Sequence, residues 1–513
     1  MTTMYKRHPE SGVWMRPGTR PVAYSEGTEA ETRLYEIVCA AGDGSVFSPE
    51  IAAHISDWST EYHFSRSRHL LLRPLAIQKG QRVLELGCGT GALTRYLGET
   101  GAKVDAVEGS LLRARIAAER CRDLPGVSVF FDDLAAFETR TAYDWVLLAG
   151  VLEYATVFST APDPVTDTLA RAARFLAPRG RLVVAIENKL GLKYFNGASE
   201  DHLGKPFYGL QGLYAPAQPI TFGKQELADR LARAGLASAR FFYPFPDYKL
   251  PDVILSDEAF EDPGIPVCDL LPWTPARDYG KPASPSFSEP LVARELHANG
   301  LLADLANSFL VVASKTILPP PHASPSIAWR FNVRVSPGLA SQTAFSLSPD
   351  GLVASRSRLL PPDRDAVVQA GPFTLRYRVG PVPVDSPAIA VDFLRAFARH
   401  GSVAPCLDTL IPWFRRLRQD AANGILDGSL FDATPFARLE WTANGPIPLT
   451  GLLARSLQQL LAAVGLPHDT PDVCDSLREL YRIQAMPEPI DPRDIAENLR
   501  IEAEFQSAIR GNP

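Results

Sequence analysis

The clearest chemical signal in the chain is a glycine-rich stretch, VLELGCGTG over residues 83–91, which lies between a predicted strand and a predicted helix. Gly87, Gly89 and Gly91 allow a ligand to approach the backbone closely, and the first turn of the following helix presents free N–H groups. Cys88 lies inside this loop, where a small residue is needed, and we interpret it as a packing residue rather than a nucleophile. The stretch therefore predicts a ligand-binding turn to which these four residues contribute.

Acidic residues on three predicted strands fit an adenosine-containing ligand. Glu108 ends the second strand, 17 residues after Gly91, where a carboxylate can accept both ribose hydroxyls. Asp132 and Asp133 end the third strand, and one of them is expected to accept the adenine amino group. Glu85 lies inside the first strand, where it would face the pyrophosphate of a dinucleotide but would suit a ligand that carries an amino group.

The glycine spacing leaves a second ligand class open. Gly87, Gly89 and Ala92 also satisfy the dinucleotide fingerprint G-x-G-x-x-G/A. A dinucleotide-dependent oxidoreductase is therefore an alternative, and the carboxylate of Glu85 disfavours it.

The order of the expected strands and helices around these residues predicts an α/β fold with a doubly wound, mostly parallel seven-stranded sheet. Short apolar runs alternate with amphipathic helical patterns, at residues 82–87, 103–108, 127–131, 143–150 and 181–187. This alternation is typical of right-handed βαβ units. Two further strands are predicted over residues 239–246 and 307–315, separated by an irregular insertion over residues 250–305 that is expected to lie over the carboxyl edge of the sheet.

The composition limits the partners and the compartment of the protein. Its 513 residues fit about three domains. The 52 basic and 58 acidic residues leave a net charge of -6, which argues against nucleic acid as a partner. The six cysteines are far apart and form no C-x-x-C, which favours the reducing cytoplasm over a disulfide framework. No transmembrane segment and no secretory signal are expected, because no apolar run is long enough and the N-terminus lacks an apolar core.

The combination of Glu85, the alternating glycines and Glu108 resembles class I S-adenosyl-methionine-dependent methyltransferases. Further motifs resemble a bacterial subfamily found with glycosyltransferases in gene sets for cell-surface polysaccharides: EYHFS, GVLEYA, AIENKLGLKYF, EDH and YPFPDYKLP, which begin at residues 61, 150, 185, 200 and 243. This resemblance covers roughly residues 57–315. It implies S-adenosyl-methionine as the cofactor, a sugar hydroxyl of a glycan precursor as the acceptor, and glycosyltransferases as partners.

Other predicted cofactor residues lie outside the glycine loop. Loops that follow parallel strands meet at the carboxyl edge of the sheet, where ligands bind. Gly150 is expected to border the methyl donor, Tyr62 to fold over it, and Arg68 to meet its carboxylate. The alternatives are core packing for Tyr62 and a surface salt bridge for Arg68.

The predicted catalytic residues lie on the acceptor side. Methyl transfer to a hydroxyl needs a base, and a neutral His202, in a loop beyond the fifth strand, suits that role. Glu153 is expected beside the methyl donor and Glu187 facing the acceptor, and both compete with His202 for the role of base. No metal is expected, because the sequence holds no H-x-x-E-type ligand cluster.

Along the chain we expect an N-terminal extension over residues 1–60, the methyltransferase domain over 61–318, a proline-rich linker over 319–326 and an α+β accessory domain over 327–513. The motif FDATPF at residues 431–436 is faintly similar to the catalytic segment of aminoglycoside-kinase-like folds, but no phosphate-binding loop accompanies it. A degenerate kinase-like or docking domain is expected. The non-enzymatic alternative for the whole chain is a scaffold that binds an adenosyl ligand and recruits polysaccharide enzymes.

Overall fold

A computed structural model describes residues 5–19, 21–22, 26–261, 265–271, 285–317, 319, 326–349, 351–362, 364–370, 373–377, 379–382, 389–422, 440–443, 453–454, 456–458, 460–461, 464, 469–484 and 491–510. The chain forms two compact units. The first comprises Met1–Glu261, Ala276–Ser286 and Gly300–Ser324, and the second comprises Asp262–Pro275, Phe287–Asn299 and Pro325–Pro513. The chain thus passes between the units more than once, so a single cut in the proline-rich stretch does not separate them.

The first unit is built on a mixed sheet with the strand order β1-β2-β5-β4-β3-β6-β7-β10-β8-β9. The strands are β1 Lys6–Arg7, β2 Trp14–Met15, β3 Arg82–Leu86, β4 Lys103–Glu108, β5 Val127–Phe131, β6 Tyr143–Ala149, β7 Leu176–Glu187, β8 Ser238–Phe245, β9 Val253–Ser256 and β10 Ser308–Ser314. From β2 to β7 the neighbouring strands pair parallel, whereas β10 runs antiparallel to both β7 and β8. The predicted parallel strands are therefore present.

The sheet is longer than the seven strands expected. At one edge the hairpin of β1 and β2 adds to β5, and at the other β9 adds to β8. The order reverses at β3, which pairs with β4 on one side and β6 on the other. In open α/β sheets, such a reversal opens a crevice at the carboxyl ends of the strands.

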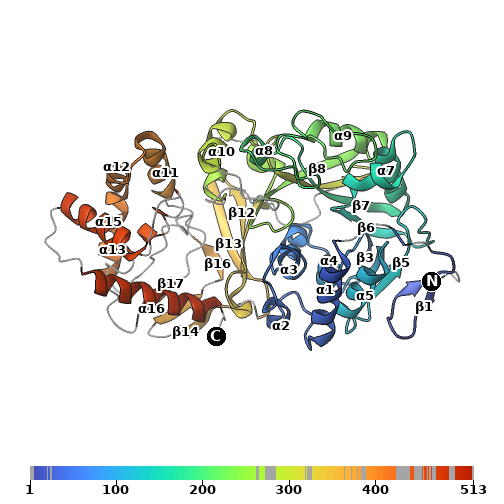
Figure 1. The fold of residues 1–513 in the computed structure, drawn as a ribbon, viewed down its shortest axis with the longest axis horizontal. Coiled ribbons are helices and arrows are strands. Elements are labelled where there is room, and N and C mark those ends of the chain that lie inside the picture. Colours follow the sequence, from blue (N-terminus) through green and yellow to red (C-terminus); the bar gives the residue numbers. More distant parts are fainter. Residues whose placement is uncertain are drawn as a thin grey trace. The chain divides into compact units, whose positions relative to one another are not determined.

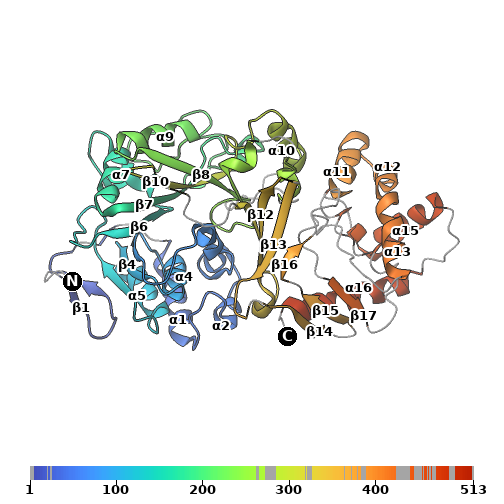
Figure 2. The same cartoon turned by 180° about the vertical axis from the view of Figure 1, so that it is seen from behind.

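Helices of the first unit form two groups. The helices are α1 Thr28–Ala40, α2 Pro49–Ala52, α3 Trp58–Phe64, α4 Ala92–Glu99, α5 Leu111–Arg120, α6 Ala155–Phe158, α7 Pro164–Arg174, α8 Leu192–Phe195 and α9 Lys224–Arg233, with one-turn to two-turn 3₁₀ helices η1 Arg68–Leu75, η2 Leu152–Tyr154 and η3 Asp257–Phe260. Figures 1 and 2 show α1, α4 and α5 on one side of β6 and β7, with α7 and α9 on the other. Central strands covered on both faces are buried, and Leu84, Val146 and Val184 are fully so.

The second unit holds antiparallel strands and helices. Its strands are β11 Ser326–Asn332, β12 Ser341–Ser348, β13 Gly351–Arg358 and β16 Gly380–Val382 in one run, and β14 Ala366–Ala370, β15 Phe373–Tyr377 and β17 Glu440–Ala443 in another. Its helices are α10 Glu289–Ala298, α11 Ile389–His400, α12 Ala404–Leu407, α13 Ile411–Ala422, α15 Thr470–Ile483 and α16 Pro492–Arg510, with η4 Val267–Asp269, η5 Pro337–Leu339 and η6 Asp408–Leu410. A buried apolar cluster joins most of these helices and includes the fully buried Phe393, Leu410 and Leu477.

The insertion that was expected to be irregular is partly regular. The stretch over residues 250–305, expected to be irregular, contains the strand β9 and the helix α10. The kinase-like motif at residues 431–436 lies outside the described residues, as do residues 320–325 of the expected linker. Among the residues that the structure describes, no helix combines the length and apolar character that crossing a bilayer requires.

Candidate active site

A cavity of about 210 Å³ opens where β3, β4 and β6 end. Most of the predicted cofactor residues line it, namely Tyr62, Arg68, Glu85, Gly87, Cys88, Gly89, Glu108, Asp133 and Gly150. Two predicted residues do not. Gly91 begins α4 in a left-handed conformation, and a Cβ there would lie 2.9 Å from the Cα of Ala117 on α5, so its glycine permits two helices to pack. Asp132 is buried and accepts a hydrogen bond from Arg16 Nη2 at 3.0 Å, which ties down the N-terminal hairpin.

The glycine loop is held by backbone bonds and leaves space in front of it. The amides of Gly87 and Cys88 both donate to the carbonyl of Val107, at 2.8 and 3.1 Å. Gly87 has a φ of 81°, and a Cβ there would lie 2.5 Å from Val151 Cγ2. Around the Cβ position of Gly89, no atom lies within 4 Å, so a side chain at Gly89 would project into open space. The thiol of Cys88 is buried, which raises its pKa well above the usual value and fits a packing role.

Two carboxylates face the cavity with different partners. Glu108 accepts hydrogen bonds from the amides of Gly89, at 2.8 Å, and Ser110, at 2.9 Å, so it fixes the loop as well as lining the cavity. Glu85 accepts a hydrogen bond from the Thr94 hydroxyl at 2.6 Å. Burial raises the pKa of Glu108, and it raises the pKa of Glu85 from 4.5 to about 7. A cationic ligand would satisfy both buried groups.

Arg68 is buried and is not a surface salt bridge. Its Nη1 donates to the carbonyls of Tyr248 at 3.0 Å and Lys249 at 3.2 Å, and its guanidinium lies over the ring of Tyr62 with 4.9 Å to the centroid. These contacts join η1 to the loop after β8. The contact of Arg68 with a cofactor carboxylate stays a prediction.

Three further ionisable residues on the cavity wall, Glu26, His63 and Arg113, were not predicted from the sequence. Glu26 accepts a hydrogen bond from Arg113 Nη2 at 2.6 Å and lies 3.2 Å from His63 Nε2, while His63 Nδ1 lies 2.8 Å from the Thr90 hydroxyl. Although burial opposes it, pairing with His63 and Arg113 lowers the pKa of Glu26 to about 2. Glu26 precedes α1 without any local motif, so only the tertiary fold brings it to the glycine loop.

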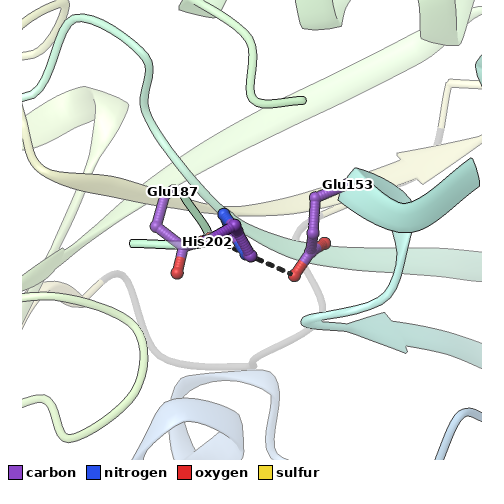
Figure 3. Close-up of side chains that lie close together, drawn as sticks. All are labelled: Glu153, Glu187 and His202. Carbon is purple, nitrogen blue, oxygen red and sulfur yellow. Dashed lines mark ion pairs between the residues drawn. The ribbon is translucent and has the colours of Figure 1, made fainter. Parts of the chain in front are cut away.

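The three predicted catalytic residues converge beside the cavity. Glu153 lies in η2, Glu187 ends β7, and His202 lies in the loop after α8. His202 Nε2 lies 3.6 Å from Glu153 Oε1 and 3.9 Å from Glu187 Oε2, with the imidazole between the two carboxylates (Figure 3). The Tyr154 ring, which lines the cavity, stands edge-on to His202 with 5.4 Å between centroids.

Further charged residues orient this group of three, which we call the Glu-Glu-His cluster. His202 Nδ1 lies 3.0 Å from Glu200 Oε1, so Glu200, rather than the neighbouring Asp201, orients the ring. Lys249 Nζ pairs with Glu187 Oε1 and donates to Asp201 Oδ1 at 2.8 Å.

Burial and neighbouring charges together shift the pKa values of His202 and Glu153. Burial opposes the charged form of His202, but Glu187, Glu153 and Glu200 outweigh it and raise its pKa well above 6.5. For Glu153, burial is the largest influence and raises the pKa. This shift in the pKa of His202 favours the protonated imidazole, whereas a free base would need the neutral form.

Comparisons with known proteins agree with the fold around the cavity. Residues 84–182 match a family described as a methyltransferase domain. The pavine N-methyltransferase of Thalictrum flavum subsp. glaucum is 32% identical over 82 residues, or 15% of this chain and 23% of that protein. The demethylmenaquinone methyltransferase of Tropheryma whipplei is 30% identical over 117 residues, or 23% of this chain and 46% of that protein. The chain thus spans less than half the length of these curated relatives.

Among solved structures, an S-adenosyl-methionine-dependent methyltransferase from Geobacter sulfurreducens in complex with S-adenosyl-L-homocysteine is 18% identical. The similarity covers 41% of this chain and 73% of that chain, with a TM-score of 0.26. The family match spans the glycine loop, Glu85, Glu108 and Glu153. Residues 84–182, which form much of the cavity wall, are therefore similar to a methyltransferase domain.

Proposed function

We propose that the protein transfers the methyl group of S-adenosyl-methionine to an acceptor held beside the Glu-Glu-His cluster. The observation that most directly supports this proposal is that the Glu-Glu-His cluster borders the cavity. Gly150 and Tyr154 line the cavity, while the Cβ position of Gly150 lies 3.6 Å from Glu153 Oε1. A methyl donor in the cavity would thus present its reactive group to buried polar side chains.

The residues of the cavity fit this cofactor. The open space in front of Gly89 accommodates a ligand against the loop, and Glu108 stands where ribose hydroxyls would be accepted. When bound, S-adenosyl-methionine supplies an electrophilic methyl group on a positively charged sulfur. Glu85 would stabilise the positive charge of the ligand, and the buried walls would exclude water. Alignment of donor and acceptor would supply much of the rate acceleration.

For the acceptor, we propose a sugar hydroxyl of a cell-surface polysaccharide precursor, methylated in the cytoplasm in association with glycosyltransferases. The motif resemblance and the polar character of the cluster support this choice. Glu153, Glu187 and His202 offer hydrogen-bonding atoms that suit a hydroxyl-bearing ligand. The acceptor hydroxyl would attack the methyl carbon in line with the departing sulfur.

A ligand screen on the full chain tests the cofactor. S-adenosyl-methionine and S-adenosyl-homocysteine are each expected to raise the melting temperature, because a ligand that binds only the native state stabilises it by about 2.7 kcal/mol at 100 times its Kd. NAD is expected to leave it unchanged. A shift with NAD alone would favour the oxidoreductase. A shift with S-adenosyl-methionine but no transfer of a labelled methyl group to any glycan precursor would favour the scaffold.

Cofactor affinity is expected to depend on pH through Glu85. Since burial raises the pKa of Glu85 to about 7, its carboxyl is increasingly protonated below that value and loses its attraction for a cation. Calorimetric affinity for S-adenosyl-methionine should fall by up to about tenfold per unit as pH drops from 7 towards 5.5. Glu85→Gln should flatten this profile, and Glu119→Gln, a change at a half-buried residue of α5 that does not line the cavity, should not. A steep profile in Glu85→Gln would assign the dependence to another group.

A further inference from the structure

We propose that Glu153, Glu187 and His202 form a binding site for a divalent cation of the Mn²⁺ or Zn²⁺ type. One carboxylate oxygen of each glutamate and Nε2 of His202 would be the ligands. The sequence did not predict this site, because its three members come from three separate segments of the chain.

The spacing of the three ligand atoms suits a cation held between them better than direct hydrogen bonds from His202 to the two glutamates. All three lie within 4.8 Å of one another. The 3.6 and 3.9 Å separations from His202 Nε2 are longer than a hydrogen bond. A cation about 2.1 Å from each ligand holds neighbouring ligand atoms roughly 3.0 to 3.4 Å apart and opposite ones about 4.2 Å apart. Small side-chain movements would therefore close the cluster around an ion.

Two buried oxygens in the cluster accept no hydrogen bond, although one of them, Glu187 Oε2, lies 3.9 Å from His202 Nε2. Glu153 Oε2 and Glu187 Oε2 are both inaccessible to solvent and accept no hydrogen bond. The two side chains are 1% and 0% exposed. Leaving a buried charged acceptor unsatisfied is costly, so both atoms call for a positively charged or hydrogen-bonding ligand.

The surroundings orient the ligands as they do in metal sites. Glu200 lies at hydrogen-bond distance from His202 Nδ1 and can hold a proton there. A cation would displace the proton from Nε2, and the freed Nε2 lone pair would face the two glutamates. Tyr214 holds Glu200 in turn, with its hydroxyl 3.3 Å from Glu200 Oε1. Lys249 engages only Oε1 of Glu187, so Oε2 remains for a cation.

The donor set indicates which cations would bind. Two carboxylates with one imidazole suit Mn²⁺, Fe²⁺ or Zn²⁺ better than Mg²⁺ or Ca²⁺, which prefer oxygen ligands alone. Three protein ligands would leave coordination positions open. If the proposed function holds, an acceptor hydroxyl could occupy one of them and lose its proton to solvent more easily. Its oxygen would then form the bond to the methyl carbon while the carbon–sulfur bond breaks and neutralises the sulfur.

Metal titration of the chelator-treated full chain tests the site without any acceptor. The electron paramagnetic resonance signal of free Mn²⁺ should stay suppressed until one equivalent has been added. Calorimetry should show tighter binding of Mn²⁺ and Zn²⁺ than of Mg²⁺. His202→Ala and Glu187→Gln should lose tight binding, so that only excess metal occupies the site, and Glu200→Gln should weaken binding about 10- to 100-fold. The matched controls are His54→Ala, at an exposed residue, and Glu119→Gln, at a half-buried residue that pairs with Arg122; both should bind as the wild type does.

The outcomes separate this inference from the proposed function. Absence of Mn²⁺ and Zn²⁺ binding to the wild-type chain overturns the site, whatever the variants do. Binding that persists unchanged in folded His202→Ala or Glu187→Gln places the ion elsewhere and also overturns it. The S-adenosyl-methionine melting shift needs no metal, so its failure alone would reject the proposed function and leave the cation site standing.

Discussion

His202→Ala is expected to bind S-adenosyl-methionine as tightly as the wild type and to transfer methyl groups about 10²- to 10⁴-fold more slowly. Cofactor affinity should persist because His202 does not line the cavity. The rate should fall because the imidazole stands between Glu153 and Glu187, where the acceptor is proposed to bind. The remaining rate would come from alignment alone.

Single-turnover transfer of a labelled methyl group, at saturating glycan acceptor, measures this effect. His54→Ala is the control, since it removes an exposed imidazole. Excess Mn²⁺ separates two roles for His202: a lost metal ligand should be partly rescued by it, and a lost base should not. Near wild-type transfer by His202→Ala would remove it from the chemistry and leave Glu153 and Glu187 as the candidates.

Local sequence signals predicted much of the cofactor side. The glycine loop and Glu108 follow from the strand–turn–helix pattern, because each position is fixed within a single βα unit. The structure places both on the cavity wall. Asp132 occupies the predicted strand end too, yet it turns to Arg16 and Tyr5. That partnership depends on a hairpin more than a hundred residues away, and no spacing rule could anticipate it.

The acceptor side was predictable in its residues but not in their arrangement. The motifs around Glu153, Glu187 and His202 pointed to function, whereas a search for spaced ligands on one helix could not find a cluster assembled from three segments. The raised pKa of His202 could not be predicted from the sequence either, because it results from the combined charges of Glu187, Glu153 and Glu200 around a buried imidazole.

The domain boundary shows a similar limit. Composition marked the proline-rich stretch as a linker, but residues 262–275 and 287–299 cluster with the second unit. Chain order alone does not reveal such a crossing. Separating the units would therefore require cuts on both sides of these segments, and the expected boundary at residues 319–326 stays a prediction.

Glu108→Ala is expected to leave the first unit folded and to weaken S-adenosyl-methionine binding by about 2–3 kcal/mol, or roughly 30- to 150-fold. The change removes the acceptor of ribose hydroxyls. It also releases the amides of Gly89 and Ser110, so part of the loss would come from a less ordered glycine loop.

Glu108→Gln separates these two contributions. Its amide oxygen can still accept from one of the two backbone amides, but it lacks the charge that strengthens hydrogen bonds to ribose. If ribose recognition dominates, calorimetry should give Glu108→Gln an affinity close to that of Glu108→Ala. If loop order dominates, Glu108→Gln should bind nearly as the wild type does. Unchanged affinity in a folded Glu108→Ala would remove Glu108 from the cofactor site, since neither contribution could then be present.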